Sequence, residues 1–203
     1  MNFINVLAGF ELGLGGIVAI VVVAVVLILV IAVVAWYIST MNWFRRTKVK
    51  VDEANSGIDV ALTKRYDILT KALASVKGYA KHESETLSKV IGMRTGNIKD
   101  LSLDEKSKLN AELNEVQRGI NVVVEQYPQL KADTQFSLLQ NQTADCEEQL
   151  QAARRVYNSN VSTFNQRRVT FPSSIVAKRI GFREDLEFFK ADEEKREDVK
   201  FEF

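Results

Sequence analysis

The residues of this 203-residue chain best suited to chemistry are His82, Glu83 and Glu85, because imidazole and carboxylate groups can bind metals or exchange protons. A two-histidine metal site on a helix needs a second His four residues on, and position 86 is Thr. His82 is the only histidine in the sequence, and one imidazole is too few for a zinc site. We therefore interpret the cluster as the polar edge of a helix and predict no catalytic, cofactor-binding or metal-binding residues.

Other polar and reactive residues fall on predicted helices. The single cysteine, Cys146, lies among apolar residues at helical spacing, which predicts a buried thiol rather than a nucleophile. Residues 64–67, with the sequence KRYD, are interpreted as a solvated helix face, from which Asp59, Lys64 and Asp67 could pair across helices. Arg154-Arg155 and Arg167-Arg168 are expected to be ordinary surface charge, and to bind anionic headgroups only if their helix approaches a membrane.

A membrane-spanning helix is predicted near the N-terminus. Residues 17–38 are uncharged and rich in Val and Ile, and a bilayer core needs roughly 20 helical residues to cross it. A lone segment in lipid must be helical, because its backbone groups find no water to bind. A cleaved signal peptide fits less well, since the run is longer than a signal core, no Lys or Arg precedes it and no A-x-A site follows it.

The charged flanks predict the orientation of this helix. Only Glu11 precedes the run, whereas four basic residues follow it, and basic residues stay on the cytoplasmic side. We predict an extracytoplasmic N-terminus over residues 1–16, a transmembrane helix over 17–38 and a cytoplasmic domain over 39–182. The basic side chains are expected to contact lipid headgroups, and aromatic rings to lie at the membrane interface. The first set is Arg45, Arg46, Lys48 and Lys50, and the second is Trp36, Tyr37, Trp43 and Phe44.

Three long helices are predicted after the membrane segment, because apolar residues recur in alternating steps of four and three. The first covers roughly residues 46–94. The second opens at the capping box Ser102–Glu105 and ends at Tyr127-Pro128. The third stops at Phe171-Pro172, and a short fourth helix over Ser173–Gly181 ends at a Gly cap. The predicted fold class is all-α, with an N-terminal transmembrane helix followed by an up-and-down antiparallel bundle of long helices and a short fourth helix. Its core is expected to contain Leu69, Leu73, Leu113, Leu139 and Leu150.

The unequal lengths of these helices predict self-association. At 1.5 Å per residue the first and third helices would extend about 70 and about 60 Å, and the second only about 36 Å. The second helix cannot cover both apolar seams, and large exposed apolar surfaces are unusual in soluble monomers. Because anchoring confines all copies to one plane, we expect a homo-oligomer of laterally packed chains.

The composition excludes some function classes. The formal net charge of +1 argues against a nucleic-acid binder, which is usually far more basic. The lone cysteine excludes a disulfide framework and fits a reducing cytosol. Residues 183–203 form an acidic, Phe-rich tail, which is either a solvated, mostly disordered segment or a docking segment whose Phe side chains fill a partner's groove.

Several motifs resemble those of the LemA family. They are Ile58-Asp59-Val60 with Lys64–Asp67, Val76–Glu83, Tyr127–Ala132, Ala153–Asn158 and Phe171-Pro172-Ser173 with Ile180-Gly181-Phe182. They occur in the family's order over residues 45–183. The resemblance implies an anchored helical bundle on the cytoplasmic side of a bacterial inner membrane, and it supplies no catalytic residues. Gly57 departs from the family pattern, and the acidic tail is expected to lie beyond the shared region.

Three functions are considered on this basis. The first is a membrane-anchored, non-enzymatic structural or scaffold protein, with the lipid bilayer, copies of itself and a membrane or cytoplasmic protein as partners, and no small-molecule substrate. The second is an assembly that shapes the membrane. The third is a hydrolase using the carboxylates near His82, which would need a pocket with convergent polar side chains.

Overall fold

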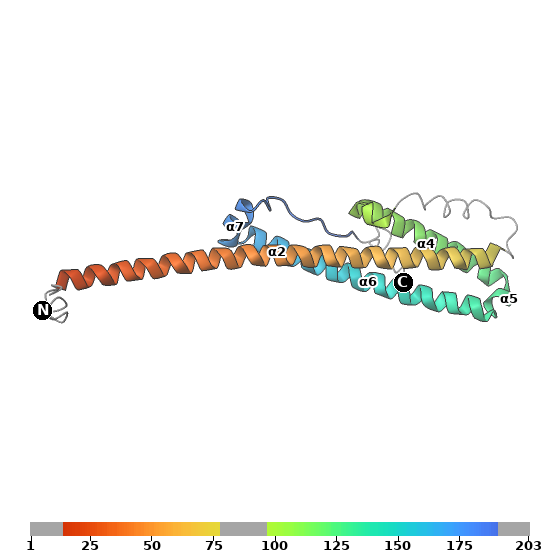
Figure 1. Ribbon diagram of the computed structural model, residues 1–203. Helices are drawn as coiled ribbons and strands as arrows, with labels where there is room; N and C mark the ends of the chain where they lie inside the picture. The colour runs from red at the N-terminus through yellow and green to blue at the C-terminus, as the bar shows by residue number, and fades with distance from the viewer. Residues whose placement is uncertain (1–13, 78–96, 191–203) are drawn as a thin grey trace, which may run out of the picture.

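The computed structural model describes residues 14–77 and 97–190, and within those ranges the chain contains helices and no strand (Figure 1). The α-helices are α2 (Leu14–Lys77), α4 (Leu103–Gln126), α5 (Pro128–Lys131), α6 (Thr134–Val169) and α7 (Ser173–Arg179), and a 3-10 turn, η1, covers Ile98–Asp100. The predicted all-α fold class is confirmed. The predicted end of the first helix and the cluster at His82, Glu83 and Glu85 lie outside the described residues.

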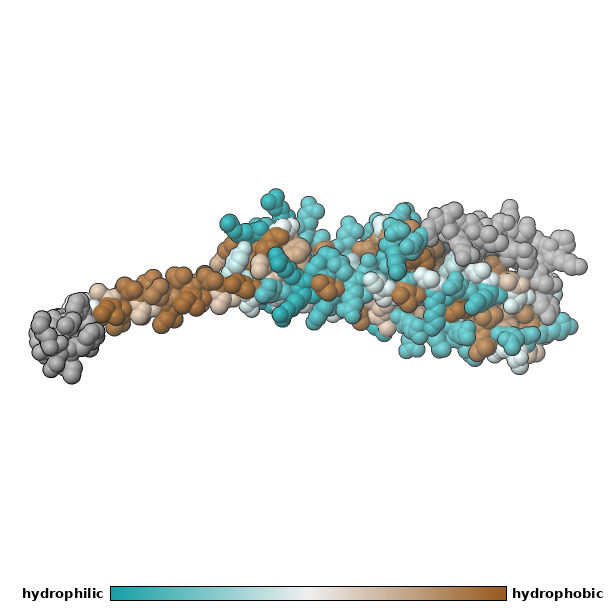
Figure 2. All heavy atoms as spheres, viewed as in Figure 1, coloured by the Kyte–Doolittle hydropathy of each residue, from teal (hydrophilic) through white to brown (hydrophobic). Residues whose placement is uncertain are grey.

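Helix α2 joins the apolar N-terminal run and the first bundle helix into one continuous helix of 64 residues, about 96 Å long. No Gly or Pro occurs between residues 17 and 56, so nothing in the sequence favours a break where the apolar run meets the charged one. Among the described helices α2 alone is long and apolar enough to cross a membrane, and its apolar window is not buried by the rest of the chain. Figure 2 shows this part as an apolar rod that leads into a hydrophilic bundle.

Helix α6 runs antiparallel to α2 along the bundle (Figure 1). The amide of Asn160 donates to the carbonyl of Lys50, and Lys64 donates to the side chain of Gln149 farther along α2. Residue numbers therefore rise on one helix as they fall on the other. This pair follows the predicted up-and-down order and forms the long axis of the bundle.

Helix α4 runs in the same direction as α2 (Figure 1). Lys106, near the start of α4, binds Asn55, and Asn114, farther along α4, binds Arg65. The strict up-and-down order therefore does not extend to α4. The return from the end of α2 to the level of Asn55 is about 33 Å along the helix axis, and the 19 residues of 78–96 can span up to about 60 Å, so the connection is long enough to allow a parallel α4.

The core follows the predicted seams. Leu69, Leu113 and Leu150 are buried as expected, whereas Leu73 and Leu139 are partly buried and pack against the core. The other buried apolar residues along the main core include Val51, Ile58, Leu62, Val76, Val116, Ile120, Val123, Phe136, Tyr157 and Val161. The four-three spacing of apolar residues therefore identified the packed face of each helix.

The predicted caps are present. The Ser102 side chain accepts a hydrogen bond from the Glu105 amide, and the Glu105 carboxylate accepts one from the Ser102 amide. At the end of α7, Gly181 has a φ of 97°, a conformation that favours glycine. The amide of Phe182 then donates to the carbonyl of Ala177, which is a Schellman cap. This turn brings the chain back along α6.

The segment after α7 covers part of the α2–α6 pair. Phe189 is 2% exposed and belongs to the main core, and Leu186 packs against it. Helix α4 covers the pair at the end far from the apolar rod, and α7 with residues 182–190 covers it nearer the rod (Figure 1). Some of the seam predicted to need a neighbouring subunit is therefore covered by the same chain.

Candidate functional site

An aromatic cluster holds α6 and α7 against α2 where the apolar rod ends. The Phe44 ring packs edge-on against Phe164 with 5.5 Å between ring centres, and Phe182 packs against both. Phe44 is fully buried, so its ring packs inside the bundle, and its interfacial placement stays a prediction. The Trp43 ring is partly exposed and lies 4.3 Å from the Arg167 guanidinium. Trp43 and Phe44 therefore both make side-chain contacts within the bundle.

The predicted headgroup ligands are placed around the same level of α2. Arg45, Arg46 and Lys50 are exposed, and Lys48 forms an ion pair with Asp52 one turn on. Trp36 is exposed and Tyr37 is partly exposed within the apolar rod. Headgroup contact by these four cations and interfacial placement of Trp36, Tyr37 and Trp43 stay predictions.

Arg65 is the centre of a buried polar network that links three helices. Its side chain is 1% exposed. The guanidinium donates to Asn110 at 2.5 Å and to Asn114 at 2.7 Å, both on α4. It also donates to Gln117 at 2.9 Å and forms an ion pair with Glu147 of α6 at 2.8 Å. The interpretation of residues 64–67 as a solvated face is therefore wrong for Arg65, although Lys64 and Asp67 are exposed.

A second buried ion pair involves Asp59, six residues before Arg65 on α2. Lys106 is 1% exposed and Asp59 is 5% exposed, and their charged groups are 2.5 Å apart. The ammonium of Lys106 also donates to the Asn55 side chain at 3.1 Å. Asp59 was expected to pair across helices, and it does so with Lys106. In both clusters a buried cation is paired with a carboxylate and also bound by side-chain amides, since an unpaired buried charge is costly.

A pattern in the sequence could have located Arg65. The buried positions 58, 61, 65, 69, 72 and 76 of α2 keep steps of three and four through the arginine. On α4, Asn110, Asn114 and Gln117 are spaced four and three apart and form one stripe. A guanidinium at a core position opposite a stripe of amide oxygens matches five donors to several acceptors.

The chain after α7 is held by two asparagines of α6 that each bind a backbone amide and its carbonyl. Asn165 accepts from the Leu186 amide at 2.9 Å and donates to the Leu186 carbonyl at 2.8 Å. Asn158 forms the same pair of bonds with Phe189, at 2.9 and 3.0 Å. The extended segment 186–190 is therefore bound as a strand would be, through its main chain.

Two further side chains of α6 complete this groove. The Tyr157 hydroxyl donates to the Glu187 carbonyl at 3.0 Å, and its burial raises the pKa of the phenol. Arg154 is 8% exposed, donates to the Lys190 carbonyl at 2.9 Å and lies 4.7 Å from the centre of the Phe189 ring. The expectation of surface charge is wrong for Arg154, and the start of the tail is a docked segment whose groove is on the same chain. Residues 191–203 lie outside the described residues.

Cys146 is a core thiol, as predicted. Its side chain is fully buried, its Sγ donates to the Ala61 carbonyl at 3.4 Å, and desolvation raises its pKa. A raised pKa lowers the fraction of reactive thiolate near neutral pH. The geometry therefore gives Cys146 no feature of a nucleophile.

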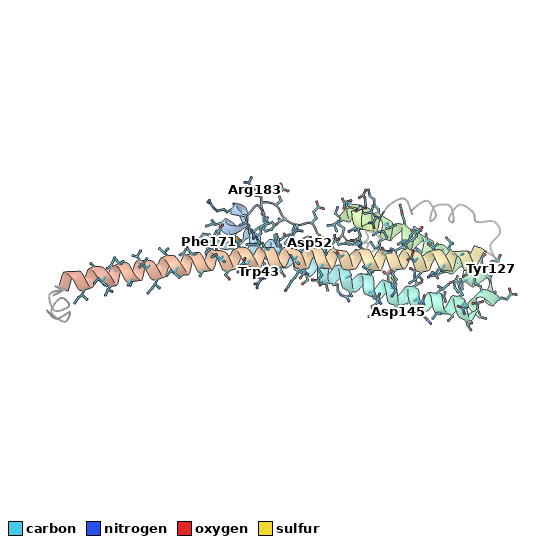
Figure 3. All side chains as sticks on the ribbon, in the orientation of Figure 1. Trp43, Asp52, Tyr127, Asp145, Phe171 and Arg183 are labelled. Atoms are coloured by element: carbon cyan, nitrogen blue, oxygen red, sulfur yellow. The ribbon has the colours of Figure 1, made fainter. Side chains whose placement is uncertain are left out.

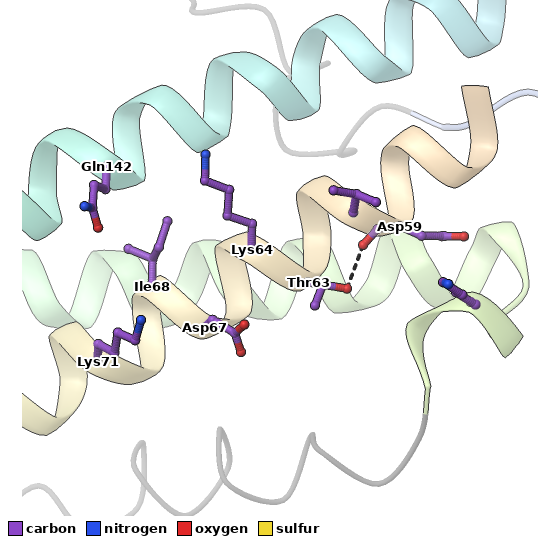
Figure 4. Close-up of a pocket in the computed structure, with 9 residues that line it drawn as sticks. Asp59, Thr63, Lys64, Asp67, Ile68, Lys71 and Gln142 are labelled. Carbon is purple, nitrogen blue, oxygen red and sulfur yellow. Dashed lines mark hydrogen bonds between the residues drawn. The ribbon is translucent and has the colours of Figure 1, made fainter. Parts of the chain in front are cut away.

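A pocket of about 600 Å³ is lined mostly by α2, with Gln142 of α6 and Lys99 of the η1 turn at its edges (Figure 4). Lys64 points toward α6 and is hydrogen-bonded to Gln149, whereas Thr63 and Asp67 point to the other side of α2. These polar groups do not converge on one point. The hydrolase hypothesis rests on the carboxylates near His82, which lie outside the described residues. Among residues 14–77 and 97–190 no group of three or more His, Cys, Asp or Glu side chains could hold a metal ion.

Comparison with known proteins identifies the family. The model of the LemA family matches residues 54–203. The chain belongs to the LemA family. It is also 29% identical over 165 residues to Protein LemA of Metamycoplasma hominis, which covers 80% of this chain and 74% of that relative. Because the family match reaches residue 203, the expectation that the acidic tail lies beyond the shared region is wrong. The LemA family is not a known enzyme family, and its membership here agrees with a membrane-associated protein whose apolar N-terminal helix is compatible with a single span.

Proposed function

We propose that this chain is a non-enzymatic interaction protein that α2 anchors in a bacterial inner membrane, with its bundle at the cytoplasmic face. The observation that carries the proposal is the continuity of α2, which runs from the apolar rod to the far end of the bundle without a break. A rigid helix that leaves the bilayer fixes the direction of everything packed on it. The bundle therefore presents one constant surface to partners.

The buried networks support an interaction role rather than catalysis. Arg65, Lys106 and Asp59 are each held by partners inside the bundle, so their charges are used to join helices. Of these three residues, only Asp59 lines the pocket beside α2. The functional surface is then the outside of the bundle.

Self-association is the second part of the proposal. Membrane anchoring holds all copies in one plane and one orientation, which raises their effective concentration. Three exposed valines on the outer faces of α2 and α6, Val49, Val60 and Val156, provide weak apolar contacts for lateral packing. Because other parts of the same chain cover some of the apolar seam of α2 and α6, less apolar surface remains to favour association, and we expect small assemblies.

Cysteine accessibility tests the topology. Cysteines are introduced singly at Asn2 and at Ala111, an exposed position on α4, while buried Cys146 remains unreactive. A membrane-impermeant maleimide should label position 2 in intact cells and position 111 only after lysis. Labelling of position 111 in intact cells would reject the cytoplasmic assignment.

The mass of the particle tests self-association. Extraction in a mild detergent should give a particle several times the 22.9 kDa chain mass, and chemical crosslinks should join α2 or α6 to its copy. A particle of one chain at native membrane density would reject self-association and leave the anchored role to partner proteins.

A further inference from the structure

The corner between α6 and α7 carries an apolar and basic surface at the end of the bundle next to the apolar rod. Phe171 is 77% exposed and Ile175 is 58% exposed, and Val169 beside them is 63% exposed. Lys178 and Arg179 follow Ile175 by three and four residues on α7, so they share its outward face. The opposite face of α7 is buried through Val176 and Ala177. We name the outward set, Val169, Phe171, Ile175, Lys178 and Arg179, the α7 corner.

The helix register places the α7 corner at the membrane end of the bundle. Asn160 of α6 is level with Lys50 of α2, and Arg167 is level with Trp43. Seven residues along α6 thus correspond to seven residues back along α2. Phe171, four residues beyond Arg167, then falls close to the end of the uncharged run at Ile38. Figure 3 shows Phe171 on the apolar-rod side of Trp43.

Basic residues are concentrated at this same end of the bundle, and acidic residues predominate elsewhere in the sequence. Residues 39–50 and 163–185, which pack together through the aromatic cluster, contain nine basic and two acidic residues. The remaining sequence contains 18 basic and 24 acidic residues. Among the described residues no carboxylate forms an ion pair with Arg45, Arg46, Lys178 or Arg179. The basic segments 39–50 and 163–185 therefore lie at the end of the bundle that adjoins the apolar rod.

We propose that the α7 corner docks on the surface of an anionic lipid bilayer, with Phe171 and Ile175 inserted at the headgroup level and Lys178 and Arg179 bound to lipid phosphates. Large exposed apolar side chains beside cations are the composition of interfacial helices. Cations near an anionic leaflet are attracted to it within a Debye length. The proposal rests on the membrane anchor of the proposed function and adds a second contact, on α7, which stops the bundle from tilting about α2.

The experiment uses the full chain in vesicles of phosphatidylcholine with or without phosphatidylglycerol. An environment-sensitive fluorophore is attached to a single cysteine at Phe171 or Ile175, in a Cys146→Ala background. Val122→Cys is the matched control, because Val122 is a comparably exposed apolar residue on α4 at the far end of the bundle. Nitroxide-labelled lipid should quench the fluorophore at 171 and 175 several-fold more than at 122, and an aqueous quencher should show the reverse order. Equal quenching at 171 and 122 would overturn the proposal.

Charge variants separate headgroup binding from apolar insertion. Lys178→Glu with Arg179→Glu should reduce lipid quenching at 171 in anionic vesicles, whereas Lys99→Glu with Lys131→Glu changes the net charge equally at exposed distal sites and should leave it unchanged. Equal effects of the two pairs would overturn the phosphate contact. Protection from the aqueous quencher without lipid quenching, growing with the protein-to-lipid ratio, would assign the corner to a second copy of the chain and overturn lipid docking.

Resistance of the chain to carbonate extraction is measured in the same vesicles. Loss of the chain into the wash would contradict the anchor itself. Retention of the chain with position 171 exposed to water would contradict only the docking of the α7 corner.

Discussion

Removal of the Arg65 side chain should weaken the bundle more than any change at a neighbouring surface cation. Arg65 is 1% exposed and binds three amides of α4 and one carboxylate of α6. Breaking a buried charge pair by deleting one partner costs about 3–5 kcal/mol. Leaving the buried Asn110 oxygen without its donor accounts for about 1–3 kcal/mol of that loss. Because Glu147 is 31% exposed and can regain water, we place Arg65→Ala near the lower limit, at about 3 kcal/mol of unfolding free energy.

Thermal unfolding of the full chain in detergent, followed by circular dichroism, measures this effect. A loss of about 3 kcal/mol lowers the midpoint by about 6–12 °C in a domain of this size. Lys64→Ala is the control, since Lys64 is exposed and has one surface hydrogen bond to Gln149, and surface changes stay within about 0.5 kcal/mol. Arg65→Met combined with Glu147→Gln should recover part of the loss, because it removes both charges and keeps the volume. Equal midpoints for Arg65→Ala and Lys64→Ala would refute the network as a source of stability.

Two further changes test the turn after α7 and the docked tail. Gly181→Ala should lower the unfolding free energy by about 1–2 kcal/mol, because residue 181 has a φ of 97°. Helical Gly57→Ala, whose added Cβ would lie 3.9 Å from Ala153, should raise it by up to about 1 kcal/mol. A raised thermal midpoint for Gly181→Ala would contradict the first assignment, and a lowered midpoint for Gly57→Ala the second. Asn158→Ala should speed hydrogen exchange at the Phe189 amide about tenfold, the effect of losing about 1.4 kcal/mol of hydrogen bonding. Asn141→Ala, at an exposed position of α6, serves as the control. Unchanged exchange at Phe189 would show that other contacts hold the tail.

The features predicted well from the sequence are those set by neighbouring residues. The capping box at Ser102, the stop at Tyr127-Pro128 and the glycine turn at Gly181 each depend on a few residues in a row. The apolar seams were also predictable, because burial of one helix face imposes a period near 3.6 whatever the partner is. These rules placed Leu69, Leu113 and Leu150 in the core.

The features that the sequence analysis missed depend on what a helix packs against. Arg65 was assigned to the surface because arginine usually lies there, and only the amides of α4 make its burial favourable. The direction of α4 depends on the length of the connection that precedes it, residues 78–96, and the spacing of apolar residues on α4 does not reveal it. The burial of Phe44 was not predicted, because Phe182, which packs against its ring, returns to it only through the turn at Gly181. Arg65 has its partners at least 45 positions away, and Arg154, which was also assigned to the surface, binds the Lys190 carbonyl 36 positions on.

The polar networks explain how α2 and α4 select one alignment. A four-three apolar seam repeats every seven residues, so Leu109, Val116 and Val123 could exchange places if α4 slid by one heptad. After such a slip Asp59 would face Leu113 in place of Lys106, and a buried carboxylate would lose its cation. Arg65 would meet Val124 where Gln117 now accepts its hydrogen bond. Since an unpaired buried charge costs several kcal/mol and the apolar contacts would change little, the charges fix the register of the bundle that α2 carries to the membrane.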